Sequence, residues 1–302
     1  MSTISYATLP ALEGYHRPRT LKAALRLLER LGPEAAVLAG GTDLLVDMRA
    51  RMSRPRRLVD ITGIEALKGV RPRRDGGVVV GAATTIGDVE RAAVIRARFP
   101  ALADAARTMG TVQVNNLATV AGNVCRASPS ADMACPLLAL DAVVEIAGAG
   151  GARTVPLAEF STGSRRTVLR PGELVTALVV PPPAAGSGGA FLRSTRTASD
   201  LARFNVAAVL ALDGEVCVDV RLVMGSVGPT LLRATAAEAV LRGRRLDDAL
   251  LGEAAAAASA AADPRPGDLQ GTPEQKRVLA EVFTARALAV ARERALAGGG
   301  GL

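Results

Sequence analysis

The chain opens with a clear helical pattern. Leucine and alanine recur at intervals of three and four residues between Thr20 and Gly32, which predicts a helix that begins after the N-cap residue Thr20 and ends at Gly32-Pro33. Short apolar runs bounded by glycine, proline or charge predict strands at residues 37–39, 58–61, 78–80 and 142–147. The first part of the chain is therefore expected to be a mixed α and β layer.

Helical and irregular segments alternate through the middle of the chain. Helices are predicted over about residues 86–98 and 101–109, and the polar residues 113–116 are expected to be irregular. The segment 181–189 (PPPAAGSGG) combines proline, which lacks an amide donor, with flexible glycine. Because such a segment extends neither a helix nor a central strand, we place an interdomain linker there.

The remainder of the chain has strand-like runs followed by helices. Strands are predicted at 205–212 and 216–224, and helices at 233–242, at 246–262 and after Thr272, which has Gln275 at the capping-box position. The predicted organisation is a first domain over 1–180, with subdomains of about 1–58 and 59–180, and a second domain over 190–302. Two domains suit 302 residues at roughly 150 residues per domain.

Composition narrows the class of protein. The net charge of +8 comes from arginines spread along the chain and only 2 % of residues are aromatic, a pattern that argues against nucleic-acid binding and suits the phosphates of a dinucleotide or an acidic partner. No apolar stretch reaches 18 residues and the amino terminus has no signal pattern, so neither a membrane span nor export is expected. We expect a soluble, cytoplasmic protein.

The chain is poor in residues that perform catalysis or bind metals. His16 is the only histidine, so a Ser-His-Asp triad, a Cys-His pair or a zinc site with several imidazoles would have to be assembled around one near-terminal residue. The cysteines Cys125, Cys135 and Cys217 form no CxxC pair and no even set, which suits a reducing compartment. We assign no catalytic residue and no metal ligand, and expect a bound cofactor to supply the chemistry.

Two glycine-containing segments could bind an oxyanion. Residues 38–44 (LAGGTDL) follow an apolar strand, and paired glycines allow a tight turn that exposes several N–H groups, although an ordinary turn has the same pattern. Residues 119–123 (TVAGN) are expected to form a second such loop, which could close on the same diphosphate. The chain has neither GxGxxG nor GxxxxGK, so a Rossmann or P-loop site is not supported.

One acidic residue follows the second loop. Asp132 could accept hydrogen bonds from ribose or ribityl hydroxyls, and it could equally be the N-cap of a short apolar helix over 133–140. Both interpretations remain open on the sequence.

These segments resemble those of a known family. The runs 38–45 (LAGGTDLL) and 119–132 (TVAGNVCRASPSAD), the opening 16–21 (HRPRTL) and residues 219–241 are similar to the medium, FAD-carrying subunit of molybdenum hydroxylases. Carbon monoxide dehydrogenase, nicotinate and quinoline-type dehydrogenases and the flavin domain of xanthine dehydrogenase belong to this group. The resemblance implies an α+β fold, namely a two-subdomain FAD-binding fold of the vanillyl-alcohol-oxidase-like type followed by a C-terminal domain with a small antiparallel sheet and helices.

The resemblance also implies which residues hold FAD without a covalent bond. By position they include two diphosphate loops, an acid for the flavin's hydroxyl chain, and residues near the isoalloxazine ring: Val37, Leu38, Ala39, Gly40, Gly41, Thr42, Asp43, Leu44, Met109, Thr119, Ala121, Gly122, Asn123, Ser128, Asp132, Leu169, Phe191 and Arg193. For Arg193 the alternative is a solvated strand arginine.

Two positions depart from the family pattern. Ala121 stands where most members have a second glycine, and it would cost about 1 kcal/mol or more if the loop required a positive φ there. Met109 occupies a position that is aromatic or β-branched elsewhere. The related benzoyl-CoA reductase branch has an extra cysteine-rich loop that this chain lacks, and Cys125 and Cys135 are interpreted as packing residues rather than redox groups.

The implied function is electron transfer within a larger enzyme. A large partner with a molybdenum cofactor would hydroxylate the substrate, and a small partner with [2Fe-2S] clusters would pass electrons to FAD in this chain, which oxygen, a quinone or NAD would then oxidise. The implied assembly is a dimer of heterotrimers. Two alternatives remain: a self-contained oxidase of the vanillyl-alcohol-oxidase-like group, and an interaction module that has lost flavin.

Overall fold

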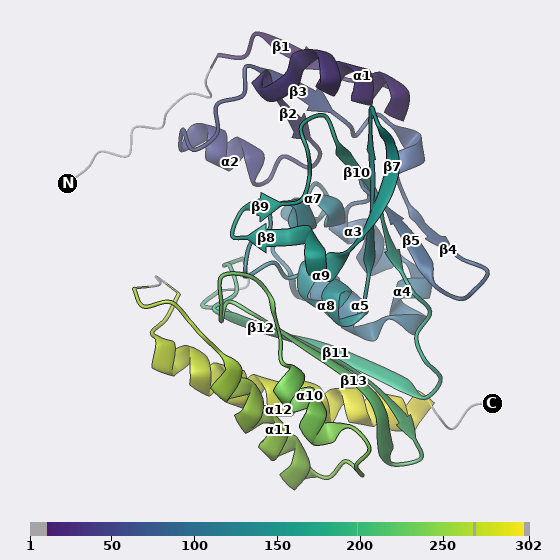
Figure 1. The fold of residues 1–302 in the computed structure, drawn as a ribbon, viewed down its shortest axis with the longest axis vertical. Helices are drawn as coiled ribbons and strands as arrows, with labels where there is room; N and C mark the ends of the chain where they lie inside the picture. The colour runs from purple at the N-terminus through teal and green to yellow at the C-terminus, as the bar shows by residue number, and fades with distance from the viewer. Residues whose placement is uncertain (1–10, 198, 268–269, 299–302) are drawn as a thin grey trace.

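The computed structural model describes residues 11–197, 199–267 and 270–298. They form three parts stacked along the long axis of the molecule, with a small sheet at one end, a five-stranded sheet in the middle and a four-stranded sheet covered by helices at the other end (Figure 1). Among the described helices, none is long and apolar enough to cross a bilayer.

The first part is a three-stranded parallel sheet with helices. Its strands lie in the order β1 (Gly14–His16), β3 (Arg57–Asp60) and β2 (Ala35–Leu38). Helix α1 (Leu21–Leu31) begins at Thr20, whose Oγ1 accepts a hydrogen bond from the Ala23 N–H, and ends at Gly32 with φ of 55°. The predicted helix and its two end residues are therefore confirmed, and its apolar face packs on β3.

The second part is built on an antiparallel sheet. Its strands lie in the order β4 (Val70–Pro72), β5 (Val78–Gly81), β10 (Leu174–Val180), β6 (Val143–Gly148) and β7 (Gly151–Pro156). Helices α3 (Ile86–Arg91), α4 (Ala93–Arg98), α5 (Pro100–Thr108) and α8 (Ala134–Ala139) pack with this sheet around one apolar core. The shortest elements complete it: α9 (Leu157–Phe160), β8 (Ser161–Gly163) and β9 (Arg166–Thr167).

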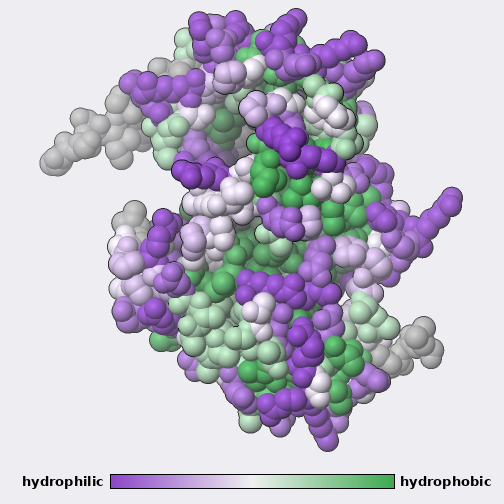
Figure 2. Space-filling view, viewed as in Figure 1, coloured by the Kyte–Doolittle hydropathy of each residue, from purple (hydrophilic) through white to green (hydrophobic). Residues whose placement is uncertain are grey.

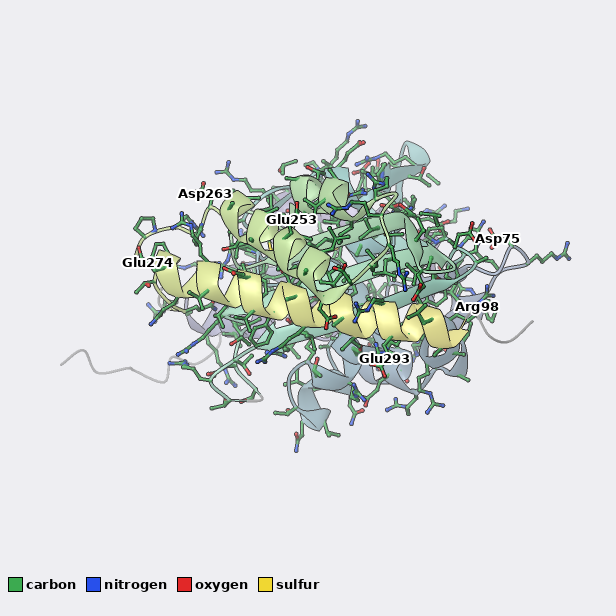
Figure 3. All side chains as sticks on the ribbon, turned by 90° about the horizontal axis from the view of Figure 1, so that it is seen from below. Asp75, Arg98, Glu253, Asp263, Glu274 and Glu293 are labelled. Carbon is green, nitrogen blue, oxygen red and sulfur yellow. The ribbon has the colours of Figure 1, made fainter. Side chains whose placement is uncertain are left out.

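The third part has a four-stranded antiparallel sheet in the order β11 (Ser187–Ser194), β12 (Phe204–Asp213), β13 (Val216–Gly225) and β14 (Leu232–Arg233). Helices α10 (Thr235–Leu241), α11 (Asp248–Ala261) and α12 (Pro273–Gly298) cover one face of it, and Figure 3 shows α11 and α12 side by side. The other face packs on the middle part, because Phe191, Ala207 and Val223 belong to the same apolar core as β5 and α5. Thr272 and Gln275 form the predicted capping box.

Several predicted boundaries are wrong. The helix expected over 86–98 is interrupted at Ala92, where ψ is 117°, and residues expected to be irregular form helix α6 (Val112–Asn115). The subdomain boundary near 58 falls inside β3, and Ile61 and Ile64 still pack in the core of the first part. The expected linker ends too late, since β11 begins at Ser187. Glycine is required at 188 because a Cβ there would lie 2.2 Å from the Ala291 carbonyl oxygen of α12.

Candidate cofactor site

A cavity of about 270 Å³ lies between the first and second parts of the molecule. Its walls come from the end of β2, the start of helix α2 (Leu44–Arg49), the start of helix α7 (Val120–Cys125), and β10 with the residues before it. In Figure 2, hydrophilic side chains predominate over the first part, and apolar residues reach the surface nearer the middle of the visible face. The lining includes most of the predicted site residues: Val37, Ala39, Gly40, Gly41, Thr42, Asp43, Leu44, Met109, Thr119, Ala121, Gly122, Asn123 and Leu169.

The first glycine segment turns between β2 and α2. Gly40 lies so close to the next segment that a Cβ there would be 2.0 Å from the Leu117 carbonyl oxygen, and Gly41 has φ of 72°, which favours glycine. Within the described part of the chain, the N–H groups of residues 40–43 have no hydrogen-bond acceptor. This segment therefore offers four adjacent main-chain donors at the cavity wall.

The second glycine segment is helical, not the loop that was expected. Thr119 is the N-cap of α7 and its Oγ1 accepts a hydrogen bond of 3.1 Å from the Gly122 N–H. Ala121 lies in helical backbone with negative φ and is buried, so its departure from glycine causes no backbone strain. Its N–H likewise finds no acceptor among the described residues. The expected penalty at Ala121 is thus removed.

The two segments converge on the same cavity although the first ends at residue 44 and the second begins at residue 119. Gly40 packs directly against the backbone of Leu117 and Ala118, immediately before Thr119. Main-chain N–H groups without an acceptor among the described residues therefore come from both segments and lie at the same cavity. This arrangement fits the diphosphate of a dinucleotide, whose oxygens accept hydrogen bonds and whose close approach requires backbone without side chains.

Charged residues that the sequence analysis missed also line the cavity. Asp47, on the first turns of α2, is hydrogen-bonded by both terminal nitrogens of Arg126, and Arg126 Nη2 lies 3.1 Å from Asp47 Oδ1. This pair holds the pKa of the Asp47 carboxyl below its usual value. Glu173 forms two hydrogen bonds, of 2.8 and 2.7 Å, with Arg153, which lowers its pKa to about 2. Arg126 and Asp47 are 79 positions apart in the sequence, and Arg153 and Glu173 are 20 apart, so no local sequence pattern indicates either pair.

Five predicted site residues lie outside this cavity lining: Leu38, Ser128, Asp132, Phe191 and Arg193. Ser128 lines a separate cavity of about 50 Å³, and Phe191 is buried in the apolar core between the middle and third parts. The Leu38 side chain packs beneath Gly41.

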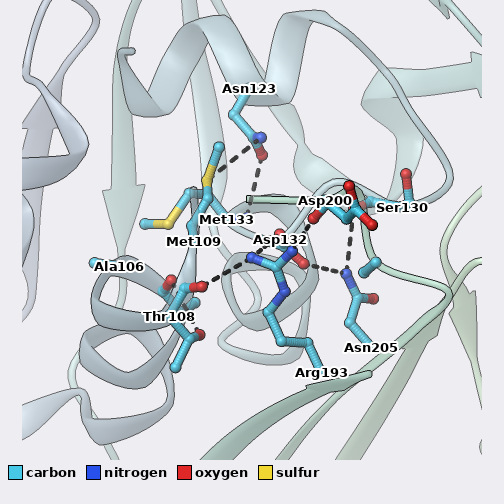
Figure 4. A network of polar contacts seen from close by, with 12 residues as sticks. Ala106, Thr108, Met109, Asn123, Ser130, Asp132, Met133, Arg193, Asp200 and Asn205 are labelled. Carbon is cyan, nitrogen blue, oxygen red and sulfur yellow. Dashed lines mark hydrogen bonds and ion pairs between the residues drawn. The ribbon is translucent and has the colours of Figure 1, made fainter. Parts of the chain in front are cut away.

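Asp132 and Arg193 form a buried ion pair behind the cavity. Their side chains are 7 % and 6 % exposed, and Asp132 Oδ2 lies 3.1 Å from Arg193 Nη1. Arg193 also donates to the Thr108 carbonyl at 2.9 Å, and Asn205 donates to Asp132 Oδ1 at 2.7 Å (Figure 4). Two of the interpretations considered from sequence are therefore wrong. Asp132 is not the N-cap of α8, which is Met133, and Arg193 is not a solvated strand arginine.

Burial raises the pKa of Asp132, while Arg193 and the hydrogen bond from Asn205 act in the opposite direction. The network is connected to the cavity through Asn123, which lines it and whose Oδ1 accepts from the N–H of Met133 at 3.2 Å. A second connection runs through Thr108, whose carbonyl accepts a hydrogen bond from Arg193 and whose neighbour in sequence, Met109, lines the cavity. The ion pair is thus one residue removed from the cavity wall on two sides.

The three cysteines are free and packed. Burial raises the pKa of the Cys125 thiol to about 12 and that of Cys217 to about 11, and the Cys135 thiol donates to the Val223 carbonyl at 3.3 Å. Thiols in this state are poor nucleophiles. The contacts favour the packing role predicted for Cys125 and Cys135.

The fold and the cavity together define a nucleotide-binding flavoprotein of two α/β units joined to a third, sheet-and-helix domain. Residues 9–183 match the family model described as the FAD binding domain in molybdopterin dehydrogenase, and residues 189–291 match the CO dehydrogenase flavoprotein C-terminal domain. The chain belongs to this family of FAD-binding oxidoreductase subunits. The resemblance and the fold class predicted from sequence are confirmed.

Relatives and solved structures agree over most of the chain. The carbon monoxide dehydrogenase medium chain of Hydrogenophaga pseudoflava is 33 % identical over 95 % of this chain and 99 % of its own length. The putative xanthine dehydrogenase FAD-binding subunit of Escherichia coli is 37 % identical over 74 % of this chain and 77 % of its own length. The structure of the Hydrogenophaga pseudoflava carbon monoxide dehydrogenase superposes with a TM-score of 0.91 at 36 % identity, covering 95 % of this chain and 99 % of that one.

Proposed function

We propose that the chain is the FAD subunit of a heteromeric molybdenum-containing hydroxylase, and that it transfers electrons from [2Fe-2S] clusters of a partner through FAD to an external acceptor. The observation that supports this proposal best is the cavity between the first two parts, where two glycine segments offer main-chain donors without acceptors among the described residues. Such donors, with Gly40 in contact with the backbone of Leu117 and Ala118, suit a diphosphate.

In this proposal the protein binds and orients the cofactor and performs no bond-making on the organic substrate. Bound FAD accepts electrons one at a time or in pairs and so links single-electron clusters to a two-electron acceptor. Residues 39–43 and 119–123 would bind the diphosphate, and Leu169 and Met109 would pack against the remainder of the cofactor. Asp132 and Arg193 would act on the flavin end of the site from behind the cavity wall, and Ser128 and Phe191, which the resemblance also assigns to that end, lie outside the cavity lining.

FAD would be held without a covalent bond. His16 lies in β1 and does not line the cavity, and the high pKa of Cys125 leaves its thiol protonated. The described lining therefore offers no reactive side chain for a histidyl or cysteinyl tether. This argues against the self-contained oxidase with tethered flavin that the sequence left open.

The proposed partners are a small iron-sulfur subunit and a large subunit with molybdenum cofactor, assembled as a dimer of heterotrimers in the cytoplasm. The names of the relatives as medium chains support the existence of a larger and a smaller subunit. The unpaired cysteines suit a reducing compartment.

Absorption spectroscopy of the purified chain tests the proposal. We expect flavin bands that move into the soluble fraction when the protein is denatured, and turnover only when both partner subunits are co-expressed. Gly40→Ala is the informative variant, because its Cβ would clash with the Leu117 carbonyl and so disturb the first segment. Gly252→Ala in α11, where a Cβ has no neighbour within 4 Å, is its matched control.

Purified protein without flavin bands, even after incubation with excess FAD, would favour the interaction module instead. Turnover of a small alcohol by the isolated chain would favour the self-contained oxidase. A Gly40→Ala variant that retains FAD as well as Gly252→Ala would place the cofactor elsewhere.

A further inference from the structure

The proposed cofactor cavity carries an unexpected charge. Its charged lining residues, within the part of the chain that the structure describes, are Asp43, Asp47, Glu173 and Arg126. A diphosphate is itself anionic, and like charges close together at a binding site are unfavourable. Three carboxylates around such a ligand therefore require compensation.

The compensation of Glu173 comes from outside the cavity lining. Arg153 binds both carboxylate oxygens of Glu173, at 2.8 and 2.7 Å, and the Arg170 N–H donates to the same group at 2.8 Å. This carboxylate is therefore fully engaged by residues of its own neighbourhood. The two aspartates on the opposite side depend on a different arginine.

Arg126 serves both aspartates at once. It follows α7 directly, as the C-cap residue, and reaches across to α2. Its Nε lies 3.4 Å from Asp43 Oδ1, its Nη2 lies 3.1 Å from Asp47 Oδ1, and its Nη1 donates to Asp47 Oδ2. Arg165 adds a longer contact of 3.5 Å to Asp47. All three nitrogens of the Arg126 guanidinium are thus directed to carboxylates.

We propose that Arg126 is a positioning residue that neutralises Asp43 and Asp47, and thereby allows the cavity to accept the diphosphate of FAD. This inference rests on the proposed function. Arg126 acts through the two aspartates, because each of its three guanidinium nitrogens already makes a contact with a carboxylate. Its side chain is 22 % exposed and that of Asp47 is 11 % exposed, so solvent screens the pair only in part.

The test compares charge changes on the two sides of the pair. Arg126→Gln leaves Asp43 without the Arg126 counter-ion and Asp47 with only the longer contact to Arg165, and we expect FAD affinity to fall about tenfold or more. Asp47→Asn removes one repelling charge, so FAD should bind as tightly as to the wild type or more tightly. Adding Asp47→Asn to Arg126→Gln should restore a large part of the lost affinity. Dissociation constants come from dilution series of the purified flavoprotein, followed by the fluorescence of released FAD.

Two further measurements separate charge compensation from a mechanical role. Raising the salt concentration should recover part of the FAD affinity of Arg126→Gln, because screening weakens the repulsion, and should affect the wild type much less. Arg126→Lys keeps the charge and should stay close to the wild type. Arg244→Gln, which breaks an exposed pair with Glu253 in the third part, is the control for the loss of one positive charge.

An Arg126→Gln variant that binds FAD like the control would overturn the inference. So would an Asp47→Asn variant that loses as much affinity as Arg126→Gln, because the pair would then act only as a mechanical link between α2 and α7. If Arg126→Gln does not fold, a tenfold loss of FAD affinity in either Arg126→Lys or Asp47→Asn would equally overturn it, at about 1.4 kcal/mol per factor of ten. A wild-type chain that binds no FAD would instead contradict the proposed function.

Discussion

At the scale of single residues, the buried ion pair behind the cavity is held by a few polar contacts. Asp132 and Arg193 are both almost fully buried, and the pair is completed by Asn205 and the Thr108 carbonyl. Removing one partner of a buried pair leaves an uncompensated charge, which is far more costly than removing both. The pair is therefore a sensitive point for stability and for the electrostatics of the cofactor site.

Replacing Arg193 by alanine should destabilise the fold by about 3–5 kcal/mol, because Asp132 then loses its counter-ion. Urea unfolding measures this change. The double variant Arg193→Ala/Asp132→Asn should recover much of the loss, since no buried charge remains. In flavin-loaded protein the single substitution Arg193→Ala should lower the midpoint potential of the flavin, because a positive charge near the site stabilises reduced flavin. An unchanged potential would show that Arg193 is purely structural.

Glu173 gives the cavity a measurable pH dependence. Its pKa is lowered from the ordinary value of 4.5 to about 2, first by the hydrogen bond from Arg153. A depressed folded-state pKa contributes stability that is fully present above about pH 4.5 and is lost as pH falls towards 2. Glu173→Gln should therefore lose stability at neutral pH and show a flatter profile between about pH 5 and about pH 2.

Chemical unfolding of the wild type and Glu173→Gln across this pH range makes the measurement. Glu293→Gln, an exposed change on α12 with the same loss of charge, serves as control (Figure 3). Parallel profiles for wild type and Glu173→Gln would show that the Arg153 pair contributes nothing to stability.

At the scale of elements, the start of α7 connects local structure with the site. Thr119 accepts from the Gly122 N–H and thereby fixes the first turn, in which Ala121 and Gly122 line the cavity. Thr119→Ala should cost about 1 kcal/mol of unfolding free energy, the usual contribution of an N-cap, and should also weaken FAD binding. Thr119→Ser keeps the hydroxyl and should retain both properties. Equal FAD affinity in the two variants would show that the N-cap hydrogen bond of Thr119 does not contribute to FAD binding.

The elements that the sequence predicted well are those with local determinants. Helix α1 has its N-cap at Thr20 and its glycine stop at Gly32, and the long helix α12 has a capping box, so neighbours in sequence determine both ends. The break at Ala92 has no proline or glycine to mark it. Strand β10 was not predicted although its apolar run LVTALVV is a local strand signal, and only its pairing with β5 and β6 depends on segments earlier in the chain.

The site was predictable only in part for the same reason. Each glycine segment is recognisable by itself, and the family resemblance placed both at one diphosphate. The charges around them, Arg126 with Asp47 and Arg153 with Glu173, are visible only after folding has brought distant segments together. The resemblance likewise placed Asp132 and Arg193 at the cofactor, whereas the fold places them one layer behind the cavity and paired with each other.

At the scale of the whole molecule, one ion pair connects the last helix to the middle part. Arg294 on α12 donates to Asp104 on α5 at 2.6 and 3.3 Å, and also to the Gly189 carbonyl of β11 at 2.7 Å. The same Asp104 accepts from the Phe191 N–H at 3.4 Å. A single carboxylate thus joins α5 of the middle part to β11 and α12 of the third part.

Arg294→Gln should loosen the docking of the third part on the middle part and lower the unfolding free energy by about 1–3 kcal/mol, the range for hydrogen bonds to charged groups. The connection at residues 181–186 should then be cut faster by a protease, because fewer contacts restrain it. Arg107 is a second partner of Asp104, and its side chain is 66 % exposed. Arg107→Gln should therefore change neither the unfolding free energy nor the cleavage rate appreciably. Equal cleavage rates in both variants would show that apolar packing through Phe191 and its neighbours holds the parts together, and that the ion pair only orients them.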